Sequence, residues 1–142
     1  MSQIIREIIE NARSSVQYRG DQLAPMGLKS CHASYLTEIC ATPGISQDGL
    51  ARKICLNKSN VARQAAILEE DGFIIRKPSE ADKRVMELYP TEKTLALMPQ
   101  ISQVLKCWES CIGDSLTEDE RELLSSLLAK MKERSVRYME DR

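Results

Sequence analysis

The spacing of apolar residues predicts long helices at both ends of the chain. Over residues 3–19, apolar side chains recur every three or four positions, as on an amphipathic helix: Ile5, Ile8, Ile9, Ala12 and Val16. Arg19-Gly20-Asp21 and Ala24-Pro25-Met26-Gly27 are expected to break this helix. Thr91 can cap a second long helix with the same spacing in Leu95, Met98, Ile101, Leu105, Trp108 and Ile112. Thr117-Glu118-Asp119-Glu120 has the form of a capping box and predicts a last helix with Leu124, Leu127, Leu128, Met131 and Tyr138 on its apolar face.

The elements between these ends are shorter. One helix is predicted where Cys31, Tyr35, Leu36, Ile39 and Cys40 share a side, before Thr42-Pro43-Gly44. Ser46 and Asn57 are suitable N-caps for two further helices, whose inward residues would be Leu50, Ala51 and Ile54, then Val61, Ala65 and Leu68. After Gly72 the pattern changes, because Phe73–Lys77 and Arg84–Tyr89 are rich in β-branched and aromatic residues. The polar segment Pro78–Lys83 joins them, which predicts a β-hairpin with a charged tip.

This order of elements predicts a mainly α fold with a small β-hairpin (α+β). Two short helices followed by a hairpin describe a winged helix-turn-helix, which we expect at residues 28–90 of a single domain spanning residues 1–142. The flanking segments, residues 1–27 and 91–142, carry apolar stripes that so small a core cannot cover. A second copy of the chain is the simplest partner for them, so we predict that they are the dimerisation helices of a homodimer.

Composition narrows the classes of function. With 42% hydrophobic and 29% charged residues, the 142-residue chain has the make-up of a soluble globular protein. It has no apolar run long enough to cross a membrane and no signal-peptide pattern at its start, so we expect a cytoplasmic protein without a membrane partner. It has one histidine, no phosphate-binding glycine loop and no Gly-x-Ser-x-Gly sequence. We therefore predict no enzymatic activity, no cofactor and no metal.

The net charge of −1 argues against a nucleic-acid partner, but the charges are unevenly distributed. Residues 51–90 contain eight Lys/Arg and six Asp/Glu, whereas residues 112–142 contain six and eight. In the basic stretch, five polar or basic residues lie on the predicted helix face opposite its apolar side: Lys58, Ser59, Asn60, Arg63 and Gln64. That is where a DNA-reading helix needs such side chains.

Each of these side chains has a plausible contact on double-stranded DNA. Arg63 suits guanine edges, and Asn60 or Gln64 suits adenine. Lys58 and Ser59 suit phosphates or base edges. The alternative is an ordinary solvated helix face, but the short helix before it and the hairpin after it favour DNA.

The hairpin tip, Asp82-Lys83-Arg84, is the second candidate contact. A planar guanidinium on a thin β-ribbon can enter a narrow minor groove, where the potential is strongly negative. Asp82, two residues earlier, can hold the Arg84 side chain extended. The alternative is a solvent-exposed turn whose charges serve solubility.

Five segments stand in a recognisable order: Leu50-Ala51-Arg52-Lys53-Ile54, Asn57-Lys58-Ser59-Asn60-Val61-Ala62-Arg63, Leu68-Glu69-Glu70-Asp71-Gly72-Phe73-Ile74-Ile75-Arg76, Asp82-Lys83-Arg84 and Thr91-Glu92-Lys93. Together they resemble the multiple-antibiotic-resistance regulator (MarR) family, and the resemblance extends over essentially the whole chain. It implies a homodimeric bacterial transcription regulator, expected to be a repressor, that reads a pseudo-palindromic operator. The family's effectors, small aromatic acids and phenols, would release the protein from that operator.

The resemblance also implies roles for individual residues. The residues that it places in the recognition helix are Ser59, Asn60, Arg63 and Gln64. It places Arg84 in the wing that enters the minor groove. It places Asp82 at the position of the residue that orients this arginine in the family. Pro90 and Thr94 stand where the family usually has Leu and Gly, and they are expected to change the angle between the wing and the following helix.

The five cysteines leave an alternative open. Cys107 and Cys111 lie four residues apart, hence on one helix face, and Cys31 opens a helix expected to pack near them. These three thiols could sense oxidants or electrophiles, or bind a soft metal, which would make the protein a thiol- or metal-responsive regulator. Alternatively they are small buried apolar side chains, as we expect of the inward-facing and inert Cys40 and Cys55.

His32 is expected to lie at a helix surface or to be half-buried.

A different function also stays open, because the winged helix could bind other proteins instead of DNA. Elution from heparin separates the two functions, because only a DNA reader should elute at a salt concentration that depends on Arg63 and Arg84.

Overall fold

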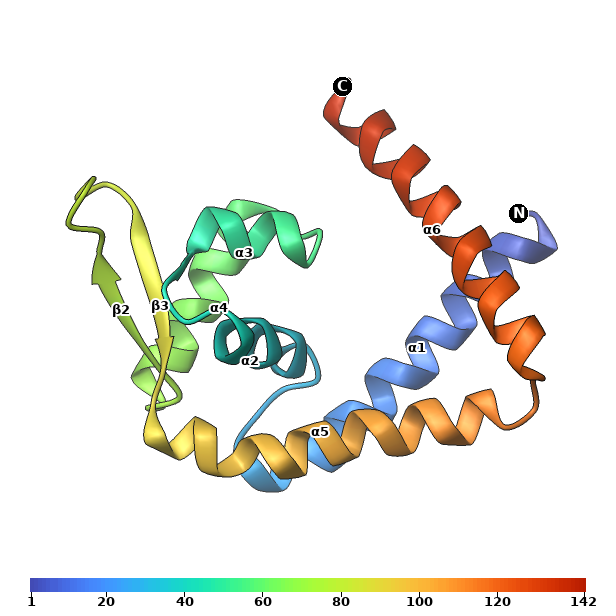
Figure 1. Ribbon diagram of the computed structural model, residues 1–142, viewed down its shortest axis with the longest axis horizontal. Helices are drawn as coiled ribbons and strands as arrows, with labels where there is room; N and C mark the ends of the chain where they lie inside the picture. Colours follow the sequence, from blue (N-terminus) through green and yellow to red (C-terminus); the bar gives the residue numbers. More distant parts are fainter. The chain divides into compact units, whose positions relative to one another are not determined.

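The computed structural model describes all 142 residues, as six α-helices, one 3-10 helix and three short strands (Figure 1). The elements in chain order are α1 (Gln3–Leu23), η1 (Ala24–Met26), α2 (His32–Ala41), β1 (Ile45–Ser46), α3 (Gln47–Lys53), α4 (Lys58–Glu70), β2 (Ile74–Pro78), β3 (Met86–Pro90), α5 (Glu92–Gly113) and α6 (Glu118–Glu140). The chain divides into two compact units, Met1–Leu105 and Lys106–Arg142, and α5 runs from the first into the second. A mainly helical chain with a small antiparallel sheet confirms the predicted fold class. None of its helices is both long and apolar enough to span a bilayer.

Helix α1 is longer than the sequence predicts. It continues through Gly20 to Leu23, so Arg19-Gly20-Asp21 does not break it. Glycine inside a helix costs about 1 kcal/mol relative to alanine. The complete burial of Leu23 at the end of the helix offsets this cost. The chain turns only after Pro25, at Gly27, where a φ of 77° lies in the left-handed region that favours glycine.

Helices α3 and α4 begin directly after the two residues that the sequence identifies as caps. Ser46 Oγ accepts a hydrogen bond from the Gly49 backbone N–H at 2.9 Å, and Asn57 Oδ1 accepts one from the Asn60 N–H at 2.7 Å. Each cap satisfies a backbone donor that the first helical turn leaves unpaired. Between the two helices, Cys55 has a φ of 57°, which is uncommon for a residue other than glycine and redirects the chain toward α4.

The predicted hairpin is present, together with a third strand that the sequence does not reveal. Strands β2 and β3 pair antiparallel, with Ile74 opposite Pro90 at one end. Strand β3 begins at Met86, two residues later than the predicted run Arg84–Tyr89, so Arg84 lies in the turn, at the predicted hairpin tip. Strand β1 pairs with the other edge of β3, giving the order β1-β3-β2. With only two residues, β1 is too short to show an alternating pattern.

The core of Met1–Leu105 forms among α2, α3, α4 and the sheet. Its completely buried side chains come from the apolar faces that the sequence predicts: Tyr35, Leu36, Ile39, Leu50, Val61, Ala65, Leu68 and Leu88. Ile101 of α5 and Leu23 of α1 close the same cluster. This shared core fixes α4 relative to the hairpin, which positions both elements of the candidate site.

Two threonines fix the start of α5 against the end of α4. Thr91 Oγ1 donates a hydrogen bond to the Gly72 carbonyl at 2.7 Å and accepts one from the Thr94 N–H at 3.4 Å. Thr94 is completely buried, and its Oγ1 donates to the Phe73 carbonyl. Lys93 Nζ lies 4.1 Å from the centre of the Phe73 ring, within range of a cation–π interaction. The Thr94 hydrogen bond is one that a glycine at this position could not make.

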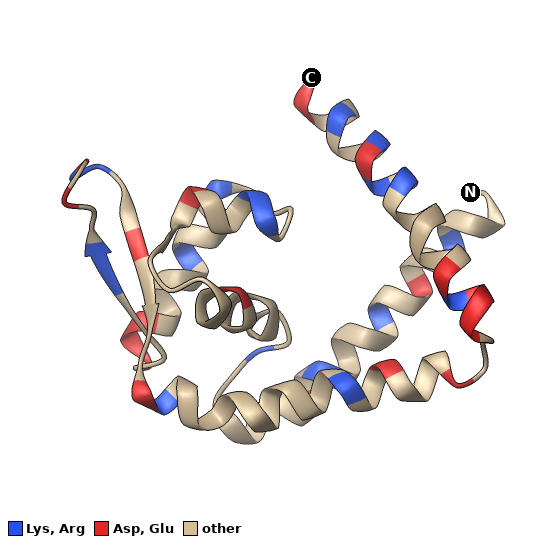
Figure 2. Ribbon diagram, in the orientation of Figure 1, with Lys and Arg blue, Asp and Glu red and all other residues tan.

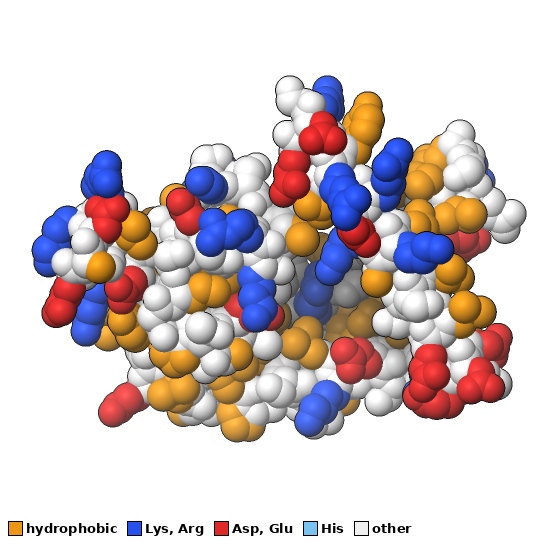
Figure 3. Space-filling model, turned by 45° about the horizontal axis from the view of Figure 1, so that its top comes forward, with side chains coloured by type: hydrophobic (Ala, Val, Ile, Leu, Met, Phe, Trp, Pro, Cys, Tyr) orange, Lys and Arg blue, Asp and Glu red, His pale blue; other side chains and the backbone are white.

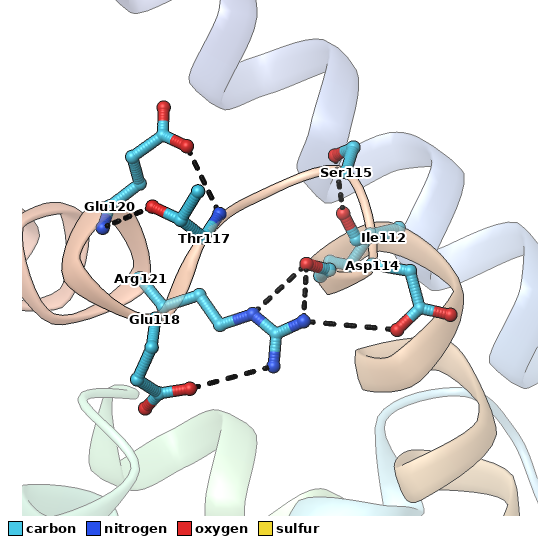
Figure 4. Close-up of polar contacts among 8 residues, drawn as sticks. Ile112, Asp114, Ser115, Thr117, Glu118, Glu120 and Arg121 are labelled. Carbon is cyan, nitrogen blue, oxygen red and sulfur yellow. Dashed lines mark hydrogen bonds and ion pairs between the residues drawn. The ribbon is translucent and has the colours of Figure 1, made fainter.

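In Lys106–Arg142, polar contacts hold the turn between α5 and α6 (Figure 4). The predicted capping box is confirmed, because Thr117 Oγ1 accepts from the Glu120 N–H at 3.2 Å and Glu120 Oε1 accepts from the Thr117 N–H at 3.0 Å. Arg121 Nε and Nη2 donate to the Gly113 carbonyl at the end of α5, at 3.0 and 2.6 Å. No side chain of this unit is buried. These polar contacts, and not an apolar core, therefore order the turn.

Candidate nucleic-acid interface

The predicted DNA-contacting residues begin in the first turn of α4, where Lys58 and Ser59 are exposed. Lys58 Nζ lies 3.3 Å from Asp48 Oδ2, and both side chains of this ion pair are exposed. Such pairs contribute little free energy, so the ammonium is available to a phosphate. Ser59 Oγ donates to Asn57 Oδ1, the capping oxygen, at 3.0 Å. Both residues lie beside a helix N-terminus, whose partial positive charge favours phosphate.

Arg63 and Asn60 form a pair on the same helix. Arg63 Nη2 donates to Asn60 Oδ1 at 3.0 Å, in a hydrogen bond that is exposed to solvent. The bond uses one donor of the guanidinium, which leaves its other N–H groups available to base edges. Arg63 is exposed and Asn60 is half-buried. The structure thus places Asn60 and Arg63 side by side, as the helical spacing predicts.

Gln64 does not project freely from α4. Its Oε1 lies 2.9 Å from Nε2 of His32, the first residue of α2. His32 is only 1% exposed, which corrects the expectation of a surface or half-buried position. The sequence did carry a signal for this burial. His32, Tyr35, Leu36 and Ile39 follow the spacing i, i+3, i+4 and i+7, so His32 belongs to the apolar face of its helix.

The hydrogen bonds of His32 define its protonation. Nδ1 lies 3.0 Å from the backbone N–H of Lys29, which can only donate, so Nδ1 must be an unprotonated acceptor. A neutral imidazole then carries its proton on Nε2 and donates it to Gln64 Oε1. Burial lowers the pKa of His32 below its ordinary value, and the hydrogen bond to Gln64 opposes this only in part. The ring is therefore neutral near neutral pH.

At the tip of the hairpin, Asp82 accepts three hydrogen bonds from Arg84. Arg84 Nε donates to Oδ1 at 3.1 Å and Nη2 donates to Oδ2 at 3.3 Å, while the Arg84 backbone N–H donates to Oδ1 at 3.0 Å. These bonds hold the pKa of the Asp82 carboxyl below its ordinary range, so the carboxylate stays charged. The Arg84 side chain is 91% exposed, and Lys83 beside it is also exposed. Asp82 therefore orients an arginine that is otherwise surrounded by solvent.

Arg76, which the sequence analysis did not single out, ties the hairpin to α4. Its Nε and Nη2 donate to Glu69 Oε1 at 3.2 and 3.1 Å, and its backbone N–H donates to Glu69 Oε2 at 3.0 Å. Nη1 reaches Gln47 Oε1 of α3 at 3.4 Å. These contacts lower the pKa of the Glu69 carboxyl. Arg76 thus connects β2 to both α3 and α4. The only hint of this role in the sequence is its position, as the charged residue that directly follows the apolar run Phe73–Ile75.

The surface around these residues is not uniformly basic. Lys and Arg occur on α3, α4 and the hairpin, with acidic residues between them (Figure 2). The space-filling view shows the same mixture on the hairpin, at its left side (Figure 3). On such a surface, the positions of single arginine side chains matter more for binding a polyanion than the net charge does.

Comparison with known proteins agrees with this geometry. Residues 30–86 match the profile of the MarR family. Over 132 residues the chain is 30% identical to YybA of Bacillus subtilis (strain 168), an uncharacterized HTH-type transcriptional regulator, and the match covers 93% of this chain and 88% of YybA. The chain belongs to the MarR family.

Solved MarR-like structures match nearly the whole chain. The transcriptional regulator SlyA superposes with a TM-score of 0.89 at 28% identity, covering 94% of each chain. A MarR family transcriptional regulator from Listeria monocytogenes, in complex with a 26mer DNA, superposes with a TM-score of 0.88 at 29% identity, covering 94% of this chain and 89% of that one. The winged helix fold is thereby confirmed, and the protein is a MarR family transcriptional regulator.

The cysteines of this MarR family member lie in both compact units, with Cys31 in Met1–Leu105 and Cys107 and Cys111 in Lys106–Arg142. The structure contains no group of three or more His, Cys, Asp or Glu side chains that could hold a metal ion. Cys107 and Cys111 are exposed on α5. Cys31 is half-buried, and burial raises the pKa of its thiol, which disfavours the reactive thiolate. A sensing role for these thiols stays a prediction.

The other two cysteines differ from each other. Cys40 is half-buried on α2, and burial raises the pKa of its thiol. Cys55 is exposed, so the prediction that it faces inward is wrong. The reason is its left-handed backbone conformation in the turn before α4, which the helical periodicity could not reveal.

Proposed function

We propose that this chain binds double-stranded DNA through α4 and the hairpin, which serves as the wing of the winged helix. The observation that carries the proposal is the pair of exposed arginines, each held by one neighbouring side chain, Arg63 by Asn60 and Arg84 by Asp82. A guanidinium that is already oriented loses less conformational entropy when it binds. The DNA complex of the Listeria monocytogenes relative supports the same use of the fold.

The two arginines serve different parts of the DNA in this proposal. Arg63, on α4, contacts base edges in the major groove, and Lys58, Ser59 and Asn60 contact neighbouring phosphates or bases. Arg84, at the wing tip, enters the minor groove, where groove width and phosphate charge decide its affinity. Lys83 adds a contact to the phosphate backbone there.

We propose further that the protein acts as a homodimer, with residues 28–90 binding DNA and residues 1–27 and 91–142 forming the dimerisation helices. Helix α6 supports this, because none of its 23 residues is buried although Leu124, Leu127 and Leu128 are apolar and 45, 47 and 42% exposed. Helix α1 likewise exposes Ile4 and Ile5. A two-fold dimer would read a pseudo-palindromic operator with half-sites about one helical turn apart.

The regulatory part of the proposal rests on the family resemblance. The dimer would act as a repressor, and a small aromatic or phenolic effector would release it from the operator. A titration of the protein–operator complex with a set of small aromatic acids and phenols tests this. Release by one of them at concentrations that leave the fold intact supports the proposal, and release by none contradicts it.

The DNA proposal is tested by selecting bound fragments from a randomised library at two salt concentrations. Arg63→Ala should weaken binding to the selected operator by about 1–3 kcal/mol and relax one base preference in each half-site. Arg84→Ala should weaken binding to many sequences together, with a shallower salt dependence, and Arg84→Lys should restore only part of the loss. Arg142→Ala is the matched control, because it removes one positive charge at the far end of the chain.

Two results would contradict this proposal. If wild-type protein retains no DNA and its elution from heparin is the same as that of both arginine variants, the winged helix does not read DNA. If Arg84→Ala alters the preferred bases while Arg63→Ala weakens all sequences alike, the roles of the two arginines are reversed.

A further inference from the structure

The two amide side chains of α4 are held in different ways. Asn60 and Gln64 lie one helical turn apart on the same face, so both could read bases. The oxygen of Asn60 accepts from Arg63 in an exposed bond, which solvent or DNA can replace. The oxygen of Gln64 accepts from His32, whose ring is 1% exposed. Only the second bond anchors an amide to the protein interior.

The proton pattern of His32 fixes which end of the Gln64 amide faces the ring. Nδ1 accepts from the Lys29 N–H, so Nε2 carries the ring proton and must meet the amide oxygen, not the amide nitrogen. Turning the amide around would set two donors against each other. The orientation of Gln64 therefore follows from a backbone N–H on another element.

The amide nitrogen of Gln64 is left for other partners. It makes no hydrogen bond within the protein, and it is not among the buried polar atoms without a partner, which are Arg19 Nε, Tyr35 Oη and Thr37 Oγ1. Gln64 Nε2 is therefore not completely buried. It lies on the half-buried side chain of a residue that follows Arg63 directly.

We propose that Gln64 reads DNA only as a hydrogen-bond donor, because His32 holds its oxygen toward the protein interior. This inference rests on the proposed DNA binding by α4. An amide reads adenine by accepting from N6 and donating to N7, which requires oxygen and nitrogen to face the same base edge. With its oxygen directed at His32, Gln64 can meet only acceptors. Adenine N7 and thymine O4 each offer one acceptor in the major groove, whereas guanine offers two adjacent ones, N7 and O6, with no neighbouring donor that would be left unpaired.

The energetics keep the oxygen where it is. Releasing it to reach adenine would leave the His32 N–H buried without a partner, which lowers the population of such a state by about 5- to 160-fold. Burial also keeps the ring neutral, so the donor pattern of His32 is constant near neutral pH. His32 is thus a positioning residue that sets the base preference of Gln64 without touching DNA. It replaces the adenine contact that the sequence alone predicted for Gln64.

The test is selection from a randomised half-site library by wild type, Gln64→Ala and Gln64→Glu. Wild type should prefer guanine at the position that Gln64→Ala relaxes, with a loss of affinity of about 2- to 12-fold, the range of one hydrogen bond. Gln64→Glu still accepts from His32 but offers no N–H group, so the preference should move from guanine to cytosine, whose N4 donates. Asn60→Ala is the matched control, and it should relax a different position.

A fourth variant addresses His32 itself. His32→Phe keeps a ring and frees the Gln64 oxygen, so the same position should shift toward adenine. Should this variant fail to fold, 15N NMR of the imidazole in wild type replaces it, and the spectrum is unambiguous because the chain has one histidine. The Nε2–H tautomer, with and without DNA, supports the inference.

Several outcomes overturn it. An Nδ1–H tautomer or a cationic ring at neutral pH removes the premise. A wild-type preference for adenine at the Gln64 position contradicts the proposal that Gln64 acts only as a donor. The proposal is also contradicted if Gln64→Ala selects the same bases as wild type. If wild type selects no sequence at all, DNA binding fails and this inference fails with it. If wild type selects an operator that Gln64→Ala selects equally, only this inference fails.

Discussion

Met1–Leu105 and Lys106–Arg142 are ordered by different forces. The first unit buries side chains from α2, α3, α4 and the sheet completely, among them Tyr35, Leu36 and Leu68. The second unit buries none, although α6 carries a stripe of leucines. Its local order comes from the capping box at Thr117 and from the contacts of Arg121.

This difference separates the part of the chain that its own core stabilises from the part that leaves its apolar side chains exposed. Burial of apolar surface is the largest stabilising contribution in most folded domains, and isolated helices gain little from capping alone. The winged helix can hold its DNA-reading surface with its own core. Helix α6 exposes apolar side chains, and the proposed dimer would cover them.

The largest effect that tests this comparison is loss of the dimer. Replacing Leu127 and Leu128 together by Asp puts two unpaired charges on the apolar face of α6, and dimerisation should be abolished. Sedimentation at micromolar concentration should then show a monomer. The control is Ser126→Asp with Ala129→Asp, which adds the same charge to the opposite face and should leave the dimer intact. A wild-type protein that sediments as a stable folded monomer would refute the proposed assembly.

A smaller effect is expected from truncating the core of the first unit. Leu36 is completely buried, so Leu36→Ala removes apolar contacts and leaves a cavity. The free energy of unfolding should fall by about 2–5 kcal/mol, as measured by urea denaturation. Leu123→Ala, at a side chain that is 59% exposed in the chain, is the comparison. An equal loss in both variants would mean that the two units do not differ in the way described here.

The sequence predicted those parts of the fold that local patterns specify. The caps Ser46 and Asn57 and the capping box at Thr117 were found because capping depends on residues within one turn. The end of α1 was missed because the burial of Leu23, a tertiary effect, carries the helix past Gly20. Strand β1 was missed because pairing with β3, not its own pattern, makes it a strand.

In the candidate site, too, the sequence predicted local contacts but not contacts between residues far apart in the chain. The Asp82–Arg84 pair lies within a few residues, and its orientation followed from the spacing. The bond between His32 and Gln64 joins residues 32 positions apart, so no local pattern could indicate it. That bond changes the expected chemistry of Gln64 from an adenine reader to a donor.

The capping box offers a test of how much polar contacts contribute where no core exists. Thr117→Ala removes the oxygen that accepts from the Glu120 N–H, and we expect the free energy of unfolding to fall by about 1 kcal/mol. Thr117→Ser keeps the acceptor and should retain most of the stability. The measurement is urea denaturation of both variants at equal protein concentration. Identical losses in the Ala and Ser variants would show that the hydroxyl is not what stabilises the turn.

The smallest effect that we expect is a pH dependence that belongs to the first unit alone. The pKa of His32 in the folded protein is lowered from its ordinary value of 6.5, chiefly by burial, with Lys29 lowering it further and Gln64 and Asp71 opposing. Below about pH 6.5, His32 therefore binds a proton more readily in the unfolded chain than in the folded protein. The contribution of neutral His32 to the free energy of unfolding is complete above that pH and is lost as the pH falls.

This pH window is free of the lowered carboxyl groups. Glu69, Asp82, Glu87 and Glu120 all have pKa values below their ordinary values of 3.8 to 4.5, so they titrate at lower pH. Between about pH 7 and 5 the free energy of unfolding should decrease in wild type, and His32→Phe should remove this slope whatever its effect on stability at pH 7. Urea denaturation at several pH values measures both. Since the chain has no second histidine, a slope that persists in His32→Phe would assign the pH dependence to another group and contradict a buried neutral ring at this position.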